Sequence, residues 1–411
     1  MRAEVISVGT ELLMGQIVDS DAAYIAKRLS GLGIDLFFRQ TVGDNEKRML
    51  ESIGLAASRS DVVILTGGLG PTQDDMTKQV LAKHLGRPMR MDEESKNGLE
   101  AWFSGRGQAM TPNNLRQAEF PEGALILKND WGTAPGCAVF DGGRHFIVLP
   151  GPPRELEPMM DERVMPYLSG LSGETIATKM LKVFGIGESA LEDLLEDLIS
   201  AQREVTMATY AGFGEVTLRL AVKLKAGEDP EPHFARVEPE IRRRLGQSLY
   251  AIGDDNMPQT VAKILIAGRK SLSLAESCTG GMIAAELVAV PGISEVFLEG
   301  TVVYSNEAKV RSLGVSPVTL QQFGAVSAEC ALEMAEGMRR KTGSDYALAV
   351  TGIAGPDGGS AEKPVGLCFI AVAGPGGIRA ERFLFGARRD RGFIRRMATL
   401  NALDLLRREL L

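Results

Sequence analysis

The stretch SLAESCTGGM, residues 273–282, combines a serine, a cysteine, a threonine and two glycines, residue types that serve in nucleophilic catalysis. A serine hydroxyl is a poor nucleophile at its ordinary pKa and needs a neighbouring base. The three histidines of the chain all lie far from this stretch in sequence: His84, His145 and His233. Either the fold brings one of them to the serine, or the base is another residue type.

Lys309 is the best candidate for another base. It lies in VVYSNEAKVRSLG, at the end of the next predicted strand, together with Tyr304, which would relay the proton or orient the lysine. Burial lowers the pKa of a lysine, and serine–lysine pairs replace the histidine triad in some hydrolases. Three alternatives stay open: Ser277 as a helix N-cap, Lys309 as a solvated helix residue, and Cys278 as a rival nucleophile.

Two glycine-rich turns follow the same scheme. DVVILTGGLGPTQDD (61–75) and DYALAVTGIAGPDGG (345–359) each place Thr-Gly-x-x-Gly-Pro and acidic residues after an apolar strand. Such turns expose backbone N–H groups at the carboxyl end of a strand, where phosphates bind. The predicted anion-binding glycines are Gly67, Gly68 and Gly70 in the first turn and Gly352 and Gly355 in the second. The alternative is a plain strand-to-helix turn that needs positive φ.

Paired carboxylates follow the first turn. Asp74 and Asp75 offer hard oxygen ligands beside a phosphate site, which predicts a divalent cation. The alternative is a capped helix that begins at Thr72. Three more carboxylates follow the ends of the first two predicted strands, Glu11, Asp19 and Asp44. They are expected to line the same crevice as the first glycine turn and its paired carboxylates.

Composition excludes several classes of protein. The 411 residues carry a net charge of −7, and 44% are hydrophobic and 24% charged, as in ordinary globular proteins. Basic residues form only short clusters, so no nucleic-acid partner is expected. The sequence has no signal peptide pattern and no apolar run long enough to cross a membrane. Four distant cysteines without a CxxC pair argue against a disulfide framework and favour the reducing cytoplasm.

The pattern along the chain predicts an α/β fold in three domains. Residues 1–170 alternate strands and helices, which indicates a parallel sheet covered by helices. Residues 171–251 read as strand, helix, two strands and helix, a small α+β domain. Residues 256–411 return to α/β and end in a long helix that the spacing predicts to be amphipathic.

Several motifs resemble the CinA family of competence/damage-inducible proteins over nearly the whole chain. VGTELLMGQIVDSDA, TGGLGPTQDDMT, NDWGTAPG and LPGPPREL resemble its N-terminal half, which is similar to the MoaB/MogA-type molybdopterin-binding fold. AESCTGGMIAAEL, VVYSNEAKVRSLGV and VTGIAGPDGG resemble its C-terminal domain, which also occurs alone as nicotinamide-nucleotide amidase.

For the C-terminal domain, the resemblance implies hydrolysis of the carboxamide of nicotinamide mononucleotide (NMN) to nicotinate mononucleotide and ammonia, without a cofactor. Ser277 and Lys309 would be the catalytic pair, with Tyr304 in support. The implied substrate-binding residues are Thr279, Gly280, Thr351, Gly352, Gly355 and Arg391. The family usually has Gly-Asp-Arg before the last helix, whereas this chain has GARRDRGFIR.

For the N-terminal domain, the resemblance implies an ADP-ribose pyrophosphatase that forms AMP and ribose 5-phosphate. It would need Mg²⁺, Mn²⁺ or Co²⁺ and possibly K⁺, with Gly67, Gly68 and Gly70 on the pyrophosphate. The implied metal ligands are Asp74, Asp75 and Asp44. Asp21 stands where the family more often has asparagine.

Both reactions act on nucleotides formed when NAD is consumed, so the resemblance implies a role in pyridine-nucleotide salvage. A cytoplasmic homodimer is also expected. One alternative concerns the N-terminal domain alone: it would bind a nucleotide or pterin without turnover, as a competence-related scaffold. A second alternative is a serine amidase for substrates without a phosphate.

Overall fold

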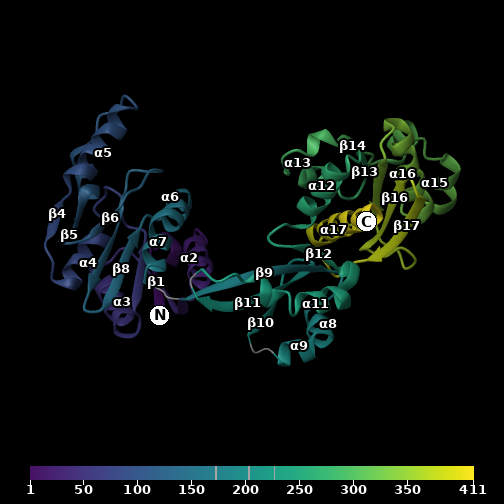
Figure 1. The fold of residues 1–411 in the computed structure, drawn as a ribbon. Helices are drawn as coiled ribbons and strands as arrows, with labels where there is room; N and C mark the ends of the chain where they lie inside the picture. The colour runs from purple at the N-terminus through teal and green to yellow at the C-terminus, as the bar shows by residue number, and fades with distance from the viewer. Residues whose placement is uncertain (172–173, 202–203, 226) are drawn as a thin grey trace. The chain divides into compact units, whose positions relative to one another are not determined.

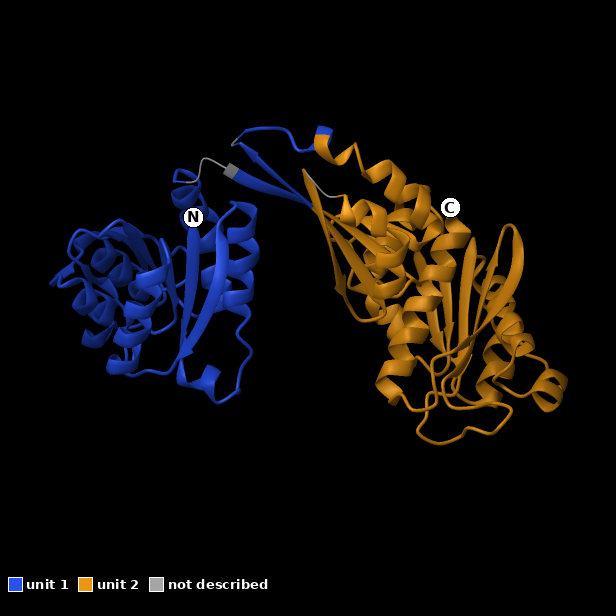
Figure 2. Ribbon diagram, turned by 90° about the horizontal axis from the view of Figure 1, so that it is seen from below, with its two compact units in different colours: residues 1–178, 221–232 blue, residues 179–220, 233–411 orange. Residues whose placement is uncertain are grey.

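The computed structural model describes residues 1–171, 174–201, 204–225 and 227–411. It divides into two compact units, residues 1–178 with 221–232 and residues 179–220 with 233–411 (Figure 2). The central segment predicted over 171–251 contributes to both units. Residues 172–173, near its start, lie outside the described part of the chain. No helix in the described residues is long and apolar enough to span a membrane.

Unit 1 contains a mixed six-stranded sheet in the order β2-β1-β3-β8-β7-β6 (Figure 1). Its first four strands are parallel, and the last two are antiparallel. The strands are β1 (Arg2–Val8), β2 (Asp35–Val42), β3 (Val62–Thr66), β6 (Leu125–Leu127), β7 (Gly136–Asp141) and β8 (Arg144–Leu149), beside a separate ribbon of β4 (Met89–Met91) and β5 (Glu119–Pro121). The helices are α1 (Thr10–Leu13), α2 (Ser20–Gly31), α3 (Glu46–Arg59), α4 (Thr77–Leu85), α5 (Glu93–Ser104), α6 (Pro153–Met159) and α7 (Met165–Ser169).

The central strands of unit 1 are buried on both faces because helices cover both sides. In β1, Ala3 and Val5 pack with α2, whereas Ile6 and Val8 pack with α3 on the opposite side. This continuous burial explains the uninterrupted apolar run of β3. It confirms the predicted α/β class with an N-terminal parallel sheet.

The remaining strands form two sheets. The central segment forms a four-stranded sheet, β10-β11-β9-β12, and the C-terminal segment forms a five-stranded sheet, β14-β13-β15-β16-β17. The strands are β9 (Glu174–Phe184), β10 (Val205–Ala211), β11 (Glu215–Lys225), β12 (Leu249–Ile252), β13 (Leu272–Glu276), β14 (Phe297–Val302), β15 (Tyr346–Gly352), β16 (Leu367–Gly374) and β17 (Gly377–Leu384). The helices are α8 (Glu188–Leu194), α9 (Glu196–Ser200), α10 (Glu231–Phe234), α11 (Glu238–Leu245), α12 (Met257–Gly268), α13 (Met282–Val288), α14 (Asn306–Leu313), α15 (Pro317–Phe323), α16 (Ala328–Thr342) and α17 (Arg391–Leu410).

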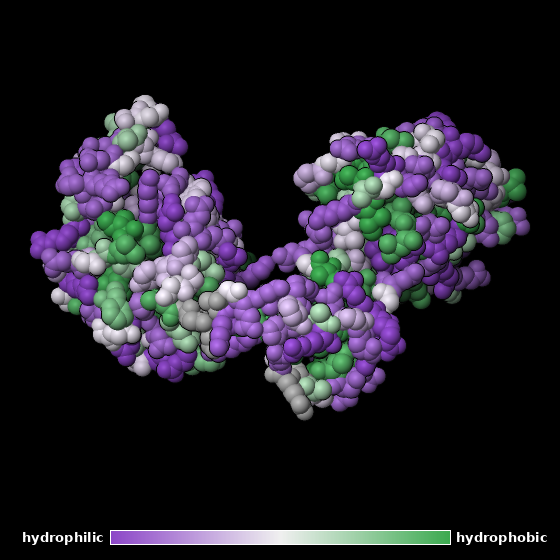
Figure 3. Space-filling model, viewed as in Figure 1, coloured by the Kyte–Doolittle hydropathy of each residue, from purple (hydrophilic) through white to green (hydrophobic). Residues whose placement is uncertain are grey.

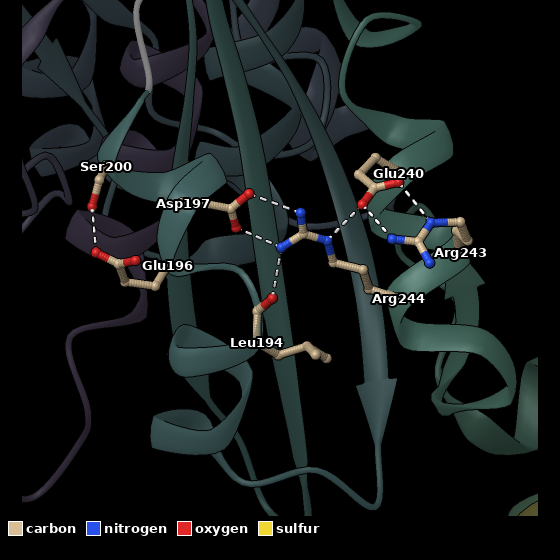
Figure 4. A network of polar contacts seen from close by, with 7 residues as sticks. All are labelled: Leu194, Glu196, Asp197, Ser200, Glu240, Arg243 and Arg244. Atoms are coloured by element: carbon tan, nitrogen blue, oxygen red, sulfur yellow. Dashed lines mark hydrogen bonds and ion pairs between the residues drawn. The ribbon is translucent and has the colours of Figure 1, made fainter.

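In the C-terminal sheet, β13 is parallel to β14 and β15, whereas β16 and β17 are antiparallel. Side chains of α12 and α17 pack on one face and those of α16 on the other. In the central segment, Arg244 of α11 donates to Asp197 of α9 at 2.8 Å and to the carbonyl of Leu194 in α8 at 2.9 Å, and its Nε donates to Glu240 within α11 at 2.7 Å (Figure 4). These ion pairs join α9 to α11.

The prediction that the last helix is amphipathic is wrong. In α17, the consecutive residues 402–407 are all buried, so the helix has no polar face near its end. Asp404 and Arg407 pair there at 2.7 Å with only 3% and 2% of their side chains exposed. The reason is that the central segment also covers this helix, since Arg407 donates to the backbone carbonyl of Gln247. On the face drawn in Figure 3, the surface of each unit is mostly hydrophilic, with separate apolar patches.

Candidate active sites

The structure brings Ser277 and Lys309 together. Ser277 directly follows β13 and Lys309 lies in α14, and the Lys309 Nζ is 3.2 Å from the Ser277 Oγ. Lys309 is only 1% exposed, so it is not a solvated helix residue. Burial lowers the pKa of Lys309, and the nearby thiols of Cys330 and Cys278 act weakly in the opposite sense. A neutral amine beside an alcohol is the arrangement that general-base activation requires.

Backbone carbonyls hold the Lys309 amine in place. Its Nζ donates to the carbonyl of Val303 at 2.8 Å and to that of Tyr304 at 3.2 Å. Apart from these two carbonyl oxygens, the group in hydrogen-bonding contact with the Lys309 amine is the Ser277 hydroxyl. The amine is therefore aimed at the hydroxyl by the chain segment between β14 and α14.

Ser277 is not a helix N-cap. The following helix, α13, begins at Met282 with Gly281 as its N-cap, and Glu276 accepts from its first N–H groups. The buried Glu276 carboxylate accepts hydrogen bonds from the N–H groups of Gly281 at 3.0 Å, Ile283 at 3.2 Å and Ala284 at 2.9 Å. The sequence analysis missed Glu276, although an acidic residue before a helix start is a recognisable signal. These N–H groups are therefore not free to bind a substrate oxyanion.

Tyr304 lies at the site, but its hydroxyl does not contact the amine. The side chain is 60% exposed, and its hydroxyl accepts a hydrogen bond from Arg391 Nη2 at 3.0 Å. Arg391 Nη1 donates to the Gly355 carbonyl at 2.8 Å. Arg391 thus links Tyr304 to the second glycine turn, and it reaches the site despite the altered sequence before α17.

The loop after Ser277 is held from α17 as well. Arg395 Nη2 donates to the Thr279 carbonyl at 2.6 Å, a role that the sequence analysis did not assign. Gly280 has a φ of +62°, which favours glycine. Thr279 is fully buried, and its hydroxyl has no hydrogen-bond partner among the described residues. That hydroxyl is a donor available to a bound carbonyl.

The second glycine turn is constrained by packing. A Cβ on Gly352 would lie 2.4 Å from the Cys368 sulfur, and one on Gly355 would lie 2.6 Å from Val365. The Thr351 hydroxyl already donates to the carbonyl of Ala325 at 2.8 Å. Close packing is therefore sufficient to explain these glycines, and of the two only Gly355 has a positive φ, +74°.

Cys278 belongs to the core beneath the site. It is 4% exposed and packs in the same cluster as Cys368. A hydrogen bond with the Cys368 thiol lowers the pKa of Cys278, against the effect of burial. The Cys278 thiol bonds to the Cys368 thiol, whereas the Ser277 hydroxyl lies 3.2 Å from the Lys309 amine, so Ser277 is the better candidate nucleophile.

Unit 1 has a cavity of about 770 Å³ beyond the carboxyl ends of β1 and β3. It is lined by all the residues predicted for this half: Gly67, Gly68, Gly70, Asp44, Asp74 and Asp75. Seven carboxylates line it in total, namely Glu11, Asp19, Asp21, Asp44, Asp74, Asp75 and Glu155, and the lining residues include no lysine or arginine. The charge of this cavity is strongly negative.

The glycines of the first turn are needed for close approach. Gly67 has a φ of +94°, and a Cβ there would lie 2.2 Å from the carbonyl oxygen of Val8. Gly68 has a φ of +65°, and a Cβ there would lie 2.4 Å from the Thr77 hydroxyl. That hydroxyl donates to the carbonyl of Gly67 at 2.7 Å. The turn therefore draws β1, β3 and α4 together at the cavity.

The alternative of a capped helix starting at Thr72 is wrong. α4 begins at Thr77, and residues 70–76 form a loop along the cavity. Asp75 accepts from both the N–H of Thr72, at 2.9 Å, and its hydroxyl, at 2.6 Å, which closes this loop. Asp44 likewise accepts from the N–H and hydroxyl of Thr10.

Among the described residues, no three histidine, cysteine or acidic side chains converge closely enough to form a metal cage. The predicted ligands Asp44, Asp74 and Asp75 line one cavity but do not form a preassembled cluster. Mg²⁺ commonly binds through one or two carboxylates, several waters and the phosphates of a substrate. The residues present fit that mode of binding.

Asp21 is the most perturbed carboxylate in the cavity. It is 8% exposed, its Oδ2 accepts from Thr66 at 3.3 Å, and its Oδ1 has no partner among the described residues. Burial raises the pKa of Asp21 to about 6, and the negative charges of Asp19 and Glu157 add to this effect. The carboxyl group is therefore poised to exchange a proton near neutral pH.

Asp21→Asn is expected to raise the free energy of unfolding of unit 1 at pH 7 by about 1–3 kcal/mol. The folded state binds the Asp21 proton more tightly than the unfolded chain, so the stability of the wild type falls as the pH rises from about 4 to 6. The neutral amide removes this loss. Urea unfolding followed by tryptophan fluorescence at pH 4.5 and pH 7 tests it, because Trp102 and Trp131 both lie in unit 1. A variant less stable than the wild type at pH 7 would contradict the assignment.

Fold and sites together define a chain that joins an α/β domain with an acidic cavity to a serine–lysine site on a separate α/β domain. Three family models match it in order: "Probable molybdopterin binding domain" over residues 4–170, "Damage-inducible protein CinA KH domain" over 178–251 and "CinA C-terminal domain" over 254–410. A relative from Acetivibrio thermocellus, whose name refers to competence and damage induction, is 48% identical over 99% of this chain and 98% of its own. The chain belongs to the CinA family.

A CinA-like protein of Dictyoglomus turgidum is 45% identical over the full length of both chains. Among solved structures, the competence/damage inducible protein CihA from Agrobacterium tumefaciens is 41% identical. That likeness covers 37% of this chain and 94% of the other, with a TM-score of 0.35.

Proposed function

We propose that the C-terminal half of the chain deamidates NMN to nicotinate mononucleotide and ammonia. The observation that carries this proposal is the 3.2 Å contact between the buried Lys309 amine and the Ser277 hydroxyl. A carboxamide is a poor electrophile, so its hydrolysis needs an activated nucleophile of this kind. Arg391, a permanent cation beside the site, supports a substrate that carries a phosphate.

In the proposed reaction, the Ser277 Oγ attacks the amide carbon while Lys309 takes the hydroxyl proton. The tetrahedral intermediate collapses when the amine returns that proton to the leaving nitrogen, which departs as ammonia and leaves an ester on Ser277. Lys309 then takes a proton from water, whose oxygen attacks the ester. The second tetrahedral intermediate collapses when Lys309 returns this proton to the Ser277 Oγ, which releases the carboxylic acid and restores both the serine hydroxyl and the neutral amine. The buried Thr279 hydroxyl, which has no hydrogen-bond partner among the described residues, is the proposed donor to the developing oxyanion.

Comparison of NMN with nicotinamide riboside tests the substrate class. The riboside has the same amide and ribose but no phosphate, so a phosphate-binding Arg391 predicts a much higher kcat/KM for NMN. Equal kcat/KM values for the two compounds would favour the alternative of a serine amidase without a phosphate requirement. Release of ammonia measures both reactions in the same assay.

For the N-terminal half, we propose hydrolysis of ADP-ribose to AMP and ribose 5-phosphate with a divalent cation, Mg²⁺, Mn²⁺ or Co²⁺, and K⁺ as a further ion. The charge of the cavity supports this proposal. Seven carboxylates and no basic side chain line it, so a diphosphate needs cations between itself and the wall. Asp74, Asp75 and Asp44 are the proposed metal ligands.

The competing candidate for the N-terminal half is a binding domain that holds a nucleotide or pterin without turnover. Its support is the match to a molybdopterin binding domain over residues 4–170. Incubation with ADP-ribose and each divalent metal, followed by detection of AMP, separates the two. Absence of AMP with every metal would favour binding alone, whereas metal-dependent AMP would favour the hydrolase.

A further inference from the structure

A second cavity of about 500 Å³ lies in unit 1 between α5 and the loop that leads into β7. Its lining differs in chemistry from that of the first cavity. Trp102 of α5 faces it together with the apolar side chains of Leu99, Ile126 and Pro135. The guanidinium of Arg106 stacks at 3.7 Å on the Trp102 ring and supports the indole. A flat aromatic ligand suits such a cavity.

The two cavities share one wall. Thr133 lines both of them, and its hydroxyl accepts a hydrogen bond from the Gln117 amide of the first cavity at 3.3 Å. Gly132 lines the second cavity and Glu155 the first, and a Cβ on Gly132 would lie 1.9 Å from the Glu155 carboxylate. Only a glycine backbone therefore separates the cavities at this point.

The wall is also fixed in position. Asn129 is 8% exposed, and its amide donates to the carbonyl of Ala134 at 3.1 Å and to Glu155 at 2.8 Å. Its side-chain oxygen accepts from the N–H of Trp131 at 3.0 Å. Both donor positions of the Asn129 amide nitrogen and its side-chain oxygen therefore have partners, so the shared wall is preorganised.

We propose that the second cavity binds the adenine ring of the nucleotide whose diphosphate occupies the first cavity. This inference rests on the proposed function of the N-terminal half and names how the site recognises its substrate. The ligand would pass over the edge of the wall at Thr133, which lines both cavities, with its phosphates and metal on the acidic side and its base against Trp102. Adenine suits the aromatic side because stacking needs no charge and because its exocyclic amine finds a carboxylate acceptor, Glu94, in the lining.

AMP and ribose 5-phosphate provide matched probes, since each carries one phosphate but only AMP carries a base. The chain has two tryptophans, so Trp131→Phe leaves Trp102 as the only one. With Mg²⁺ present, AMP is expected to change the emission of Trp102 in a saturable way, whereas ribose 5-phosphate at the same concentration leaves it unchanged. Equal responses to both compounds, or no response to AMP, would overturn the inference.

Calorimetric titration of AMP into variants of the full chain gives a second test that does not need Trp131→Phe. Trp102→Ala is expected to weaken AMP binding about tenfold, and Trp102→Phe much less, because a phenyl ring retains stacking. Phe37→Ala is the matched control, an exposed aromatic of unit 1 that lines neither cavity. An unchanged AMP affinity in Trp102→Ala would overturn the inference.

The outcomes also separate this inference from the proposed hydrolysis. AMP binding that depends on Trp102, without cleavage of ADP-ribose, supports the adenine site and counts against the hydrolase. Cleavage of ADP-ribose with a KM unaffected by Trp102→Ala supports the hydrolase and overturns the adenine site.

Discussion

Lys309→Met is expected to lower kcat for NMN deamidation by about 10³-fold or more, with a smaller effect on KM. Methionine has a similar length and no charge, so it fills the buried position without supplying a base. The loss falls on kcat because the amine acts in proton transfer and is not among the proposed phosphate contacts. Steady-state kinetics of ammonia release measures it, and thermal unfolding of the variant checks the fold.

The pH dependence gives a sharper form of this prediction. The wild-type rate should rise with pH through the lowered pKa of Lys309, because only the neutral amine accepts the serine proton. The free energy of unfolding should also rise with pH, since the unfolded chain binds the Lys309 proton more tightly than the folded one.

Lys309→Arg should stay inactive at every pH, because a guanidinium does not lose its proton. An active Lys309→Arg variant would contradict the role of the amine as base.

Removal of divalent metal is expected to abolish AMP formation from ADP-ribose and to leave NMN deamidation unchanged. In unit 1, the substrate diphosphate would face seven carboxylates without a cation, and repulsion would prevent productive binding. The proposed deamidase uses only side chains, so it provides an internal control in the same sample. Dialysis against EDTA followed by assay of both products makes the measurement.

Readdition of Mg²⁺, Mn²⁺ and Co²⁺ one at a time should restore AMP formation with at least one of them. AMP formation that persists in EDTA would contradict the proposed role of the metal. Loss of both activities in EDTA would contradict the proposal that the deamidase needs no cofactor.

The proximity of Ser277 and Lys309 could be anticipated because their strands are neighbours. β13 and β14 are parallel, so residues that follow their carboxyl ends emerge at the same edge of the sheet. The same rule placed the glycines and carboxylates of unit 1 around one cavity, since β1 and β3 are parallel neighbours. The order of the strands in each sheet could not be deduced from the spacing of the motifs. The resemblance to a family supplied the expectation that these residues lie together.

The finer contacts could not be predicted from the sequence because they depend on which of several nearby acceptors forms a hydrogen bond with a given donor. Glu276 accepts from N–H groups at the start of α13 that would otherwise be free to bind an oxyanion. The Tyr304 hydroxyl pairs with Arg391, and only its backbone carbonyl reaches Lys309. The amphipathic prediction for α17 failed for a similar reason, because the second sheet that covers its outer face is distant in sequence.

The most direct test of the proposed catalytic pair is ammonia release from NMN by the wild type and by Ser277→Ala, assayed side by side at equal concentration of folded protein. The structure-based account predicts steady release by the wild type and a rate near the uncatalysed background for Ser277→Ala, with the same unfolding temperature for both. Equal release by the two proteins, or none by the wild type, would contradict it.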